Sequence, residues 1–416
     1  MAHLLMIESW VGAMSSLLPR AIRESGHRFT FLTRDLHHYL RAAPSSPHPL
    51  LAADNVLTAE TNDVPALLSF VERAHELLAF DGVISSCDYY LSTVATVADH
   101  LGLPGPGPDA VERAYRKDLT RAATRQVPGP RFALAEDWSA TAKAAAALGY
   151  PLVVKPVDLC AGMHVRQVGD EAGLRDAFLA LEAFPVNARD QPRVPTVLLE
   201  ELLVGPEVSV ETVTSRGVTH VIGVTDKSLA GHPWFVESGH MFPADLPEVD
   251  RRAAVDTALA AIGALGLDDC VAHTEIKLTA DGPKLIEVNP RPAGNRITEL
   301  VRRVTGIDLP AVFAQLAVGQ QPDLRVRETG VRSAAVSFLL PPRSGALAGI
   351  DGTDDLARDP DVVDWAVKPA GHRAGEPTSN NSYLGHVLVT APDADARGRA
   401  ERAVGGLVVR YADDAE

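Results

Sequence analysis

The feature that most constrains this chain is a pair of short strands around a turn, in the stretch HTEIKLTADGPKLIEVNPRPAGNRITEL from His273 to Leu300. Residues 273–278 alternate partly in polarity, ADGP is a turn signal, and residues 284–288 form a second, largely apolar run. These signals predict a β-hairpin. Glu275 and Glu287 would then lie on its two paired strands.

Polar side chains follow the second strand at intervals of two. Because side chains two apart on a strand share a face, Glu287, Asn289 and Arg291 point the same way if the extended run continues. Carboxylate and amide oxygens suit Mg²⁺, and an arginine can hold a phosphate with two of its nitrogens. A hairpin whose charges simply face water is the alternative. The E-x-N-x-R spacing beside a second glutamate favours the metal and phosphate site.

The segments TEIKL and LIEVNPRPAG resemble the metal-binding end of the ATP-grasp ligases, most closely the L-amino acid ligases, which are carboxylate–amine ligases that join amino acids. The resemblance implies an α/β ATP-grasp fold with an N-terminal parallel α/β domain and a small C-terminal subdomain. It implies that Glu275, Glu287 and Asn289 hold Mg²⁺, or alternatively Mn²⁺, between the phosphates of ATP. Arg291 would be a catalytic residue that stabilises the phosphoryl and acyl-phosphate groups of the substrate.

Composition narrows the class of protein. With 46% hydrophobic and 22% charged residues the chain is typical of a soluble globular protein, and no apolar run is long enough to span a membrane. Cys87, Cys160 and Cys270 are far apart, which argues against a zinc site or disulfides and predicts a cytoplasmic protein. The net charge of −15 argues against nucleic acid as a partner, so local positive charge must hold any anionic ligand.

The N-terminal part alternates strand and helix signals. His3–Glu8 and Arg28–Thr33 are predicted strands around a helix at Ala13–Ser25, and this order favours a parallel α/β layer. No G-x-G-x-x-G follows the first strand, so a dinucleotide site is unsupported. The resemblance implies that such a domain helps to hold substrate. It ends at the Pro/Gly-rich run LPGPGP, which closes a predicted domain over residues 1–108.

Three lysines are the predicted positive charges of the ATP site. Lys155 ends the apolar strand LVVK, where its ammonium group can reach a phosphate. Lys117 lies in the helix-like segment VERAYRKDLTR, and Lys227 lies just past a predicted strand at Val218–Val224. The resemblance assigns both to the nucleotide, and Lys227 also to catalysis. The loop Asp158–Met163 is no P-loop, and its small residues predict a mobile lid.

Two further segments carry predicted binding residues. The strand Thr196–Glu200 leads into EELLVG, where the resemblance assigns the adenine and ribose to Glu200, Glu201, Leu203 and Glu207, against the alternative of a solvated pair of glutamates.

The loop AGHPWFVESGHMFPADLP combines aromatic side chains with a carboxylate and an imidazole, which is what a pocket for a zwitterionic amino acid uses. An ordered loop with His240 bonded internally is the alternative. The E-x-x-H pattern of amino-acid ligases assigns Glu237 and His240 to the substrate.

We therefore predict an ATP-grasp domain over residues 109–320, with a lid at about 120–197 and a catalytic lobe at about 198–320. A C-terminal subdomain would cover residues 321–416, with strands at Val331–Leu340, Val362–Val367 and Val387–Thr390. The segment Tyr383–His386 suggests no chemistry.

The predicted reaction is an ADP-forming ligation, in which an acyl phosphate of one amino acid reacts with the amine of a second to give a dipeptide or a γ-glutamyl-type amide. The alternatives are a biotin-carboxylase-like subunit and a non-catalytic nucleotide-binding regulator. We expect small-molecule amino-acid substrates and a homodimer.

Overall fold

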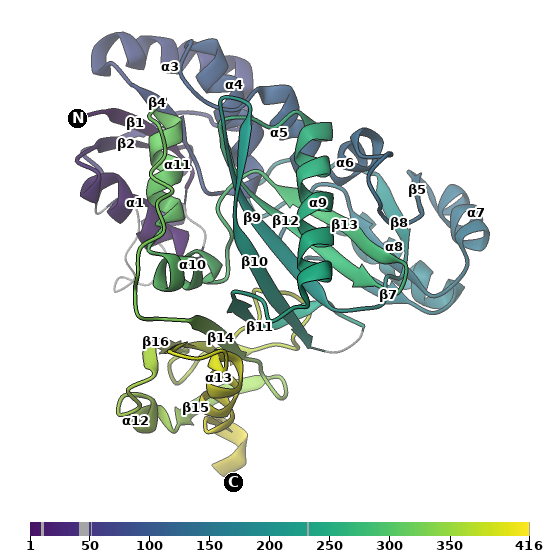
Figure 1. Ribbon diagram of the computed structural model, residues 1–416. Coiled ribbons are helices and arrows are strands. Elements are labelled where there is room, and N and C mark those ends of the chain that lie inside the picture. The colour runs from purple at the N-terminus through teal and green to yellow at the C-terminus, as the bar shows by residue number, and fades with distance from the viewer. Residues whose placement is uncertain (10–11, 41–49, 51, 231–232, 416) are drawn as a thin grey trace.

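The computed structural model describes residues 1–9, 12–40, 50, 52–230 and 233–415. Four parts of the chain surround one cavity: an N-terminal α/β region, a lid, a large central sheet and a C-terminal layer (Figure 1). Gly231 and His232 of the predicted substrate loop lie outside the described residues.

The N-terminal region is a parallel sheet with strand order β3-β2-β1-β4, as the alternation of strand and helix signals predicts. Its strands are β1 (His3–Ile7), β2 (Arg28–Thr33), β3 (Asn55–Thr58) and β4 (Gly82–Ile84), and its helices are α1 (Met14–Glu24), α2 (Leu36–Leu40), α3 (Val64–Leu78) and α4 (Leu91–His100). The later helix α11 (Leu309–Ala317) packs on the same core through Ala314 and Ala317, so this region is joined to the catalytic part by apolar contact.

Two short helices lead into the lid. They are α5 (Pro108–Tyr115) and α6 (Lys117–Ala123), and the extended conformation of Arg116 separates them. The predicted helix-like segment is therefore broken, and Lys117 begins a helix instead of lying in the middle of one. Its backbone N–H donates to the carbonyl of Val157, at the base of the lid loop, over 2.9 Å.

The lid is an antiparallel sheet of order β5-β8-β6-β7 with two helices on it. The alanine-rich run Ala133–Leu148 predicts one helix, but this prediction is wrong at its start. Phe132–Ala135 pairs with β8 as a strand, and Asp137 caps the helix two residues later. The elements are β5 (Phe132–Ala135), β6 (Leu152–Pro156), β7 (Arg166–Val168), β8 (Val197–Glu201), α7 (Trp138–Leu148) and α8 (Glu171–Glu182).

The central sheet has the order β13-β12-β9-β10-β11-β14-β18-β16. The predicted hairpin is confirmed, with Glu275 directly opposite Glu287. The strands are β9 (Glu207–Ser215), β10 (Val218–Ala230), β11 (Val236–Phe242), β12 (Cys270–Thr279), β13 (Gly282–Asn289), β14 (Ser333–Leu339), β16 (Val362–Val367) and β18 (Gly385–Ala391).

Two strand predictions in this sheet were wrong. β10 runs on to Ala230, so Lys227 lies within a strand and not past its end. The predicted substrate loop contains β11, which pairs with β10 and β14. In both places hydrogen bonds with the partner strands stabilise a strand that the polar residues of the segment do not predict.

The C-terminal strands β14, β18 and β16 do not form a sheet of their own but continue the central sheet. A second, small sheet of order β17-β15-β19 lies beside them. Its elements are β15 (Gly345–Asp351), β17 (Arg373–Ala374) and β19 (Val408–Tyr411), accompanied by α12 (Thr353–Leu356) and α13 (Ala396–Gly405). This arrangement brings C-terminal residues to the cavity.

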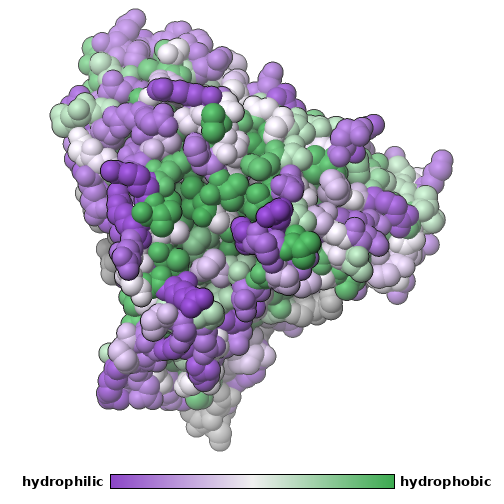
Figure 2. Space-filling view, in the orientation of Figure 1, coloured by the Kyte–Doolittle hydropathy of each residue, from purple (hydrophilic) through white to green (hydrophobic). Residues whose placement is uncertain are grey.

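One face of the molecule has an apolar patch. Figure 2 shows hydrophobic side chains gathered in the middle of this face, between α11 and β10, with hydrophilic side chains around them. No helix in the described part of the chain is long and apolar enough to cross a membrane.

Candidate active site

A cavity of about 650 Å³ lies between the lid, the central sheet, the N-terminal region and the C-terminal strands. Its wall contains every residue assigned above to ATP, metal or substrate except His240. Those wall residues are Lys117, Lys155, Glu200, Glu201, Leu203, Glu207, Lys227, Glu237, Glu275, Glu287, Asn289 and Arg291.

The floor of the cavity is a polar face of the central sheet. Strand alternation directs Glu207, Ser209 and Glu211 of β9 to one face, while Val208 and Val210 pack on the other. That apolar face is covered by α9 (Glu248–Leu265) through buried alanines, among them Ala254 and Ala258. The helix thereby fixes which side of the sheet presents its charges to the cavity.

Lys227 is the centre of this polar face. Its side chain is 1% exposed, and its ammonium group lies 3.1 Å from Glu207, 3.0 Å from Glu237 and 2.6 Å from Glu275. Burial alone would lower the pKa of Lys227, but the three carboxylates outweigh it and raise this pKa well above its ordinary value. The sequence assigned Lys227 to phosphates. The structure places it among carboxylates, which it holds in fixed positions.

Glu275, Glu287 and Asn289 lie together, as the hairpin predicts. Glu287 lies opposite Glu275, and the side-chain nitrogen of Asn289 donates to Glu287 over 3.0 Å. Lys117 lies 3.2 Å from the other oxygen of Glu287. Burial would raise the pKa of Glu287, but the charge of Lys117 and the Asn289 bond lower it. His273 bonds Glu275 over 3.1 Å.

This donor set fits Mg²⁺. Two carboxylates and one amide oxygen are hard ligands, and Mg²⁺ typically takes the rest of its octahedron from phosphate and water. Among the described residues, no group of three or more His, Cys, Asp and Glu side chains is arranged to hold a metal ion by itself. Lys117 and Lys227 keep Glu287 and Glu275 ionised, which is the form that binds a cation.

The part of the cavity beside the lid strands β6 and β8 contains a buried charge triad. Glu200 accepts from Arg121 over 2.6 Å and lies 2.6 Å from Lys155, and all three side chains are buried. Burial, together with the charge of Arg121, lowers the pKa of Lys155 despite its carboxylate partner. Arg121 was missed from the sequence. Its position in the sequence could have indicated it, because Arg121 follows Lys117 by four residues on one helix and the two side chains share a face.

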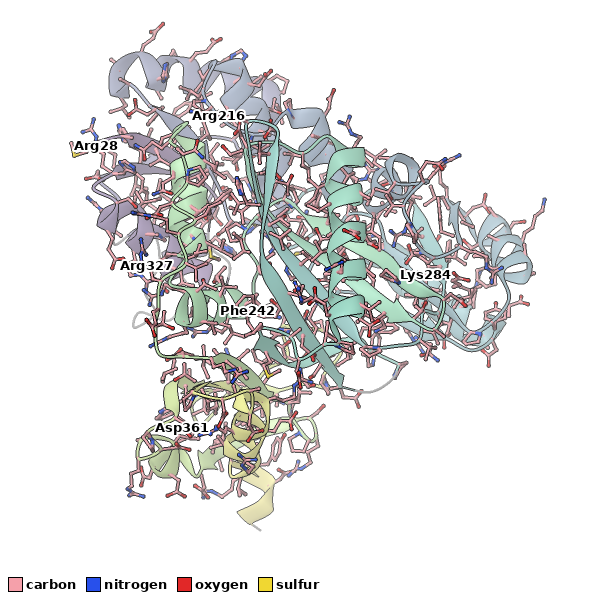
Figure 3. The ribbon with its side chains drawn as sticks, in the orientation of Figure 1. Arg28, Arg216, Phe242, Lys284, Arg327 and Asp361 are labelled. Carbon is pink, nitrogen blue, oxygen red and sulfur yellow. The ribbon has the colours of Figure 1, made fainter. Side chains whose placement is uncertain are left out.

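Glu201 faces the solvent side of this end. It bonds Arg131 over 2.8 Å and Lys284 over 3.1 Å, and these bonds outweigh burial and lower its pKa to about 2. Lys284, labelled in Figure 3, lies on β13 where the central sheet meets the lid. Leu203, two residues on, lines the cavity.

Arg291 does not continue the strand. β13 ends at Asn289, and the guanidinium of Arg291 lies 2.7 Å from Asp88 of the N-terminal region. Burial opposes its charge, but Asp88 raises the pKa of Arg291 further above its ordinary value. Arg291 therefore follows the strand as part of a turn, although it lines the same cavity as Glu287 and Asn289. Asp88 was missed because nothing in SSCDYY marks a partner two hundred residues away.

The other end of the cavity is organised around Glu237 on β11. The Nε2 of His240 lies 3.2 Å from the carboxylate of Glu237 and donates a hydrogen bond to it, and the side-chain nitrogen of Asn295 donates to the same oxygen. The backbone N–H of Glu237 donates to the side chain of Asn380 over 3.0 Å. His240 is buried and does not line the cavity, so it contacts Glu237 from behind.

Aromatic rings complete this end. The rings of Phe338 and Tyr383 are stacked, with centroids 4.2 Å apart and an angle of 7°, and both line the cavity. Asn295, Asn380 and Tyr383 were all missed from the sequence. Asn295 directly follows the LIEVNPRPAG motif, whose position could have drawn attention to it, whereas Asn380 and Tyr383 lie in a segment without a strand pattern or motif. Only the tertiary fold brings those two residues to the cavity.

Three sequence families match successive parts of the chain. The ATP-grasp N-terminal domain matches residues 20–105, the ATP-grasp domain matches residues 148–299, and the L-amino acid ligase C-terminal domain 2 matches residues 337–412. The uncharacterized protein y4rH of Sinorhizobium fredii is 31% identical over 365 residues, which cover 86% of this chain and 74% of that protein. The chain belongs to the ATP-grasp carboxylate–amine ligases. This confirms the predicted family and fold.

Named relatives of this ligase are longer proteins. Alanine–anticapsin ligase of Bacillus subtilis is 27% identical over 61% of this chain and 57% of that enzyme. Human carnosine synthase 1 is 26% identical over 76% of this chain and 40% of that enzyme. The chain thus spans about half the length of the curated ligases it matches.

Solved structures agree on the fold of this ligase. An L-amino acid ligase from Bacillus licheniformis has a TM-score of 0.81 at 24% identity, with 99% of each chain covered. An N5-carboxyaminoimidazole ribonucleotide synthetase solved with ADP has a TM-score of 0.72 at 17% identity, with 97% of this chain and 96% of that chain covered. ATP is the nucleotide of this family.

Proposed function

We propose that this ATP-grasp ligase activates the carboxylate of an amino acid as an acyl phosphate, with release of ADP, and joins it to the amine of a second amino acid. The observation that carries the proposal is one cavity with two different ends. Lys155 and Glu200 lie at one end, Glu237 lies at the other, and the Glu275–Glu287 pair lies between them. A nucleotide and a zwitterion therefore fit head to head across the hairpin.

The cavity residues have three proposed roles: metal binding, nucleotide binding and positioning of the carboxylate of Glu237. Glu275, Glu287 and Asn289 would hold Mg²⁺, which supplies charge neutralisation to phosphate oxygens when bound. Lys155 and Lys117 face the phosphates, while Glu200, Glu201, Leu203 and Glu207 surround the adenine and ribose. Lys227 fixes Glu237 relative to Glu275 and adds positive charge beside the phosphates.

Glu237 is suited to the α-ammonium group of an amino acid. Its three partners leave it ionised: burial opposes its charge, but Lys227 and His240 lower the pKa of Glu237 well below its ordinary value. Arg291, held by Asp88 at the edge of the hairpin, offsets charge that develops when the substrate carboxylate attacks the γ-phosphate. The amine then attacks the acyl carbon, and the amide and phosphate are released.

The named relatives support amino acids as the substrate class, since their names are those of enzymes that act on alanine and anticapsin or make carnosine. We also propose dipeptides or γ-glutamyl-type amides as products, the domain limits 1–108, 109–320 and 321–416, and a homodimer.

The deciding experiment incubates the purified enzyme with ATP, Mg²⁺ and all pairs of the common amino acids. ADP release and product mass are measured in the same wells. We expect at least one pair to give ADP together with a mass equal to the sum of both amino acids less water. ADP formed only with bicarbonate would instead support biotin-carboxylase-like chemistry.

A further inference from the structure

A C-terminal segment crosses from the small sheet to the cavity and touches two functional parts of the enzyme at once. We name residues 376–383 the strap. Within it, the backbone N–H of Asn380 donates to the carbonyl of Ala161 over 3.2 Å, and its side-chain oxygen accepts from the backbone N–H of Glu237 over 3.0 Å. A single residue therefore bonds both the lid loop and the strand that carries Glu237.

The two bonded groups have different roles in the proposed reaction. Ala161 lies in the loop over residues 158–163, whose base is held by Tyr115 and Lys117 through the carbonyls of Asp158 and Leu159 over 2.7 and 2.9 Å. Glu237 presents its carboxylate to the cavity. Asn380 thus joins the free side of the lid loop to the amino-acid end.

The strap is anchored independently of Asn380. The ring of Tyr383 stacks on Phe338 of β14, with the ring centroids 4.2 Å apart. Within the strap, Ser382 donates to the carbonyls of Ser379 and Glu376 through its N–H and its hydroxyl over 3.1 and 3.4 Å, which holds the shape of the segment. Removing the Asn380 side chain therefore leaves the strap in place. It removes only the bond from the Glu237 N–H, while the backbone N–H of residue 380 keeps its bond to the carbonyl of Ala161.

We propose that Asn380 is a positioning residue that couples closure of the lid loop to the amino-acid end, so that the acyl phosphate is kept for the amine. The inference rests on the proposed function. Attack of the amine on the acyl carbon breaks the bond to phosphate and gives an amide, phosphate and a proton. Attack of water breaks the same bond and returns the free carboxylate with phosphate. Both routes consume one ATP, so the ratio of ADP to amide measures the loss to water.

The test compares ADP and amide formation in wild type, Asn380→Ala, Asn380→Asp and Glu376→Ala. Asn380→Ala should raise ADP per amide roughly threefold to tenfold, the factor expected for loss of one neutral hydrogen bond. Its KM for ATP should stay unchanged. Asn380→Asp keeps an acceptor oxygen and should stay near the wild-type ratio. Glu376 is exposed on the same strap, and its variant is the matched control.

An unchanged ratio in a folded Asn380→Ala enzyme overturns the inference, as does an equal rise in Glu376→Ala. A second experiment does not depend on product formation. It measures hydrogen exchange at residues 157–165 and at the Glu237 amide, with an ATP analogue and Mg²⁺ present. We expect both places to exchange faster in Asn380→Ala than in wild type, and equal exchange in the two enzymes counts against the coupling. If the wild type makes no amide from any pair, the proposed function fails, and the exchange arm alone then decides on Asn380.

Discussion

The two ends of the cavity are built in different ways. At the nucleotide end each charged residue lies near the end of a strand or on the neighbouring helix. The carboxylate of Glu200 pairs with both Lys155 and Arg121. Lys227 joins the two ends, because its ammonium group pairs with Glu207 and Glu275 as well as with Glu237 of the amino-acid end. The remaining groups of the amino-acid end come from loops and from the C-terminal part of the chain. Paired strands thus place the charged groups at both ends, and the amino-acid end adds contacts from segments outside helices and strands.

This difference suits the chemistry of the family. ATP is the nucleotide of the family, and the residues proposed to bind it lie on regular elements. The proposed amino-acid end includes Asn295 and Tyr383, which lie outside helices and strands and can be exchanged without disturbing a strand. Variants at the two ends should therefore fail in distinguishable ways.

The largest effect is expected between the ends, at the hairpin. Glu287→Gln should lower kcat by at least about a hundredfold, because it removes one negative charge where Mg²⁺ binds. The isosteric change should leave the thermal unfolding midpoint close to that of wild type. The measurement is Mg²⁺-dependent ADP release, with Glu248→Gln, an exposed carboxylate of α9, as control. Near-normal activity in folded Glu287→Gln would remove the metal assignment.

The next effect concerns stability and separates the two lysines. Lys227→Met should destabilise the fold by about 3–5 kcal/mol, because it leaves buried carboxylates without their cation. Lys155→Met should cost less, since Arg121 still neutralises Glu200, and should mainly raise the KM for ATP. Urea unfolding measures both, and Lys143→Met on an exposed helix position is the control. Equal destabilisation by the two variants would mean that the ends do not differ as described.

The same contrast explains what the sequence could predict. The hairpin, Lys155 and the Glu200 segment follow from strand alternation and turn residues, which are local, and the structure has them where the pattern puts them. The β11 strand was read as a loop because Pro233 and Ser238 interrupt its apolar pattern, and its pairing with β10 and β14 decides the outcome.

Residues whose partners are distant in sequence could not be predicted. Asp88 and Arg291 meet only because α11 and the N-terminal sheet share a core, and Asn380 meets Glu237 only because C-terminal strands complete the central sheet. Residues 184–195 show the same limit, because their polar side chains and prolines predict a surface loop. Asn187 and Arg189 are buried there, and the carbonyl of Arg189 accepts from Asn62 of the N-terminal region over 2.9 Å.

A smaller effect should separate two residues within the amino-acid end. Glu237→Gln should raise the KM for an amino acid by roughly a hundredfold and leave that for ATP unchanged, because it removes a charged substrate contact. His240→Ala should raise it only about tenfold, because His240 acts through Glu237 and does not line the cavity. Steady-state kinetics with each substrate varied in turn make the comparison. A larger effect of His240→Ala than of Glu237→Gln would show that the imidazole itself meets the substrate.

The smallest expected effect is a change in motion at the lid loop, where the two ends meet. Ala161 and His164 have φ values of +56° and +57°, and such left-handed conformations cost backbone free energy in residues other than glycine unless contacts hold them. Residues 158–163 lie outside helices and strands, so single contacts with Tyr115, Lys117, Arg193 and Asn380 hold the loop. Hydrogen exchange over residues 158–163 should therefore slow severalfold when an ATP analogue and Mg²⁺ bind, while the α4 helix, whose core is independent of the cavity, should not change. Slowing at both places would indicate general stabilisation by the ligand, and equal exchange in the loop with and without nucleotide would mean that these residues are not a lid.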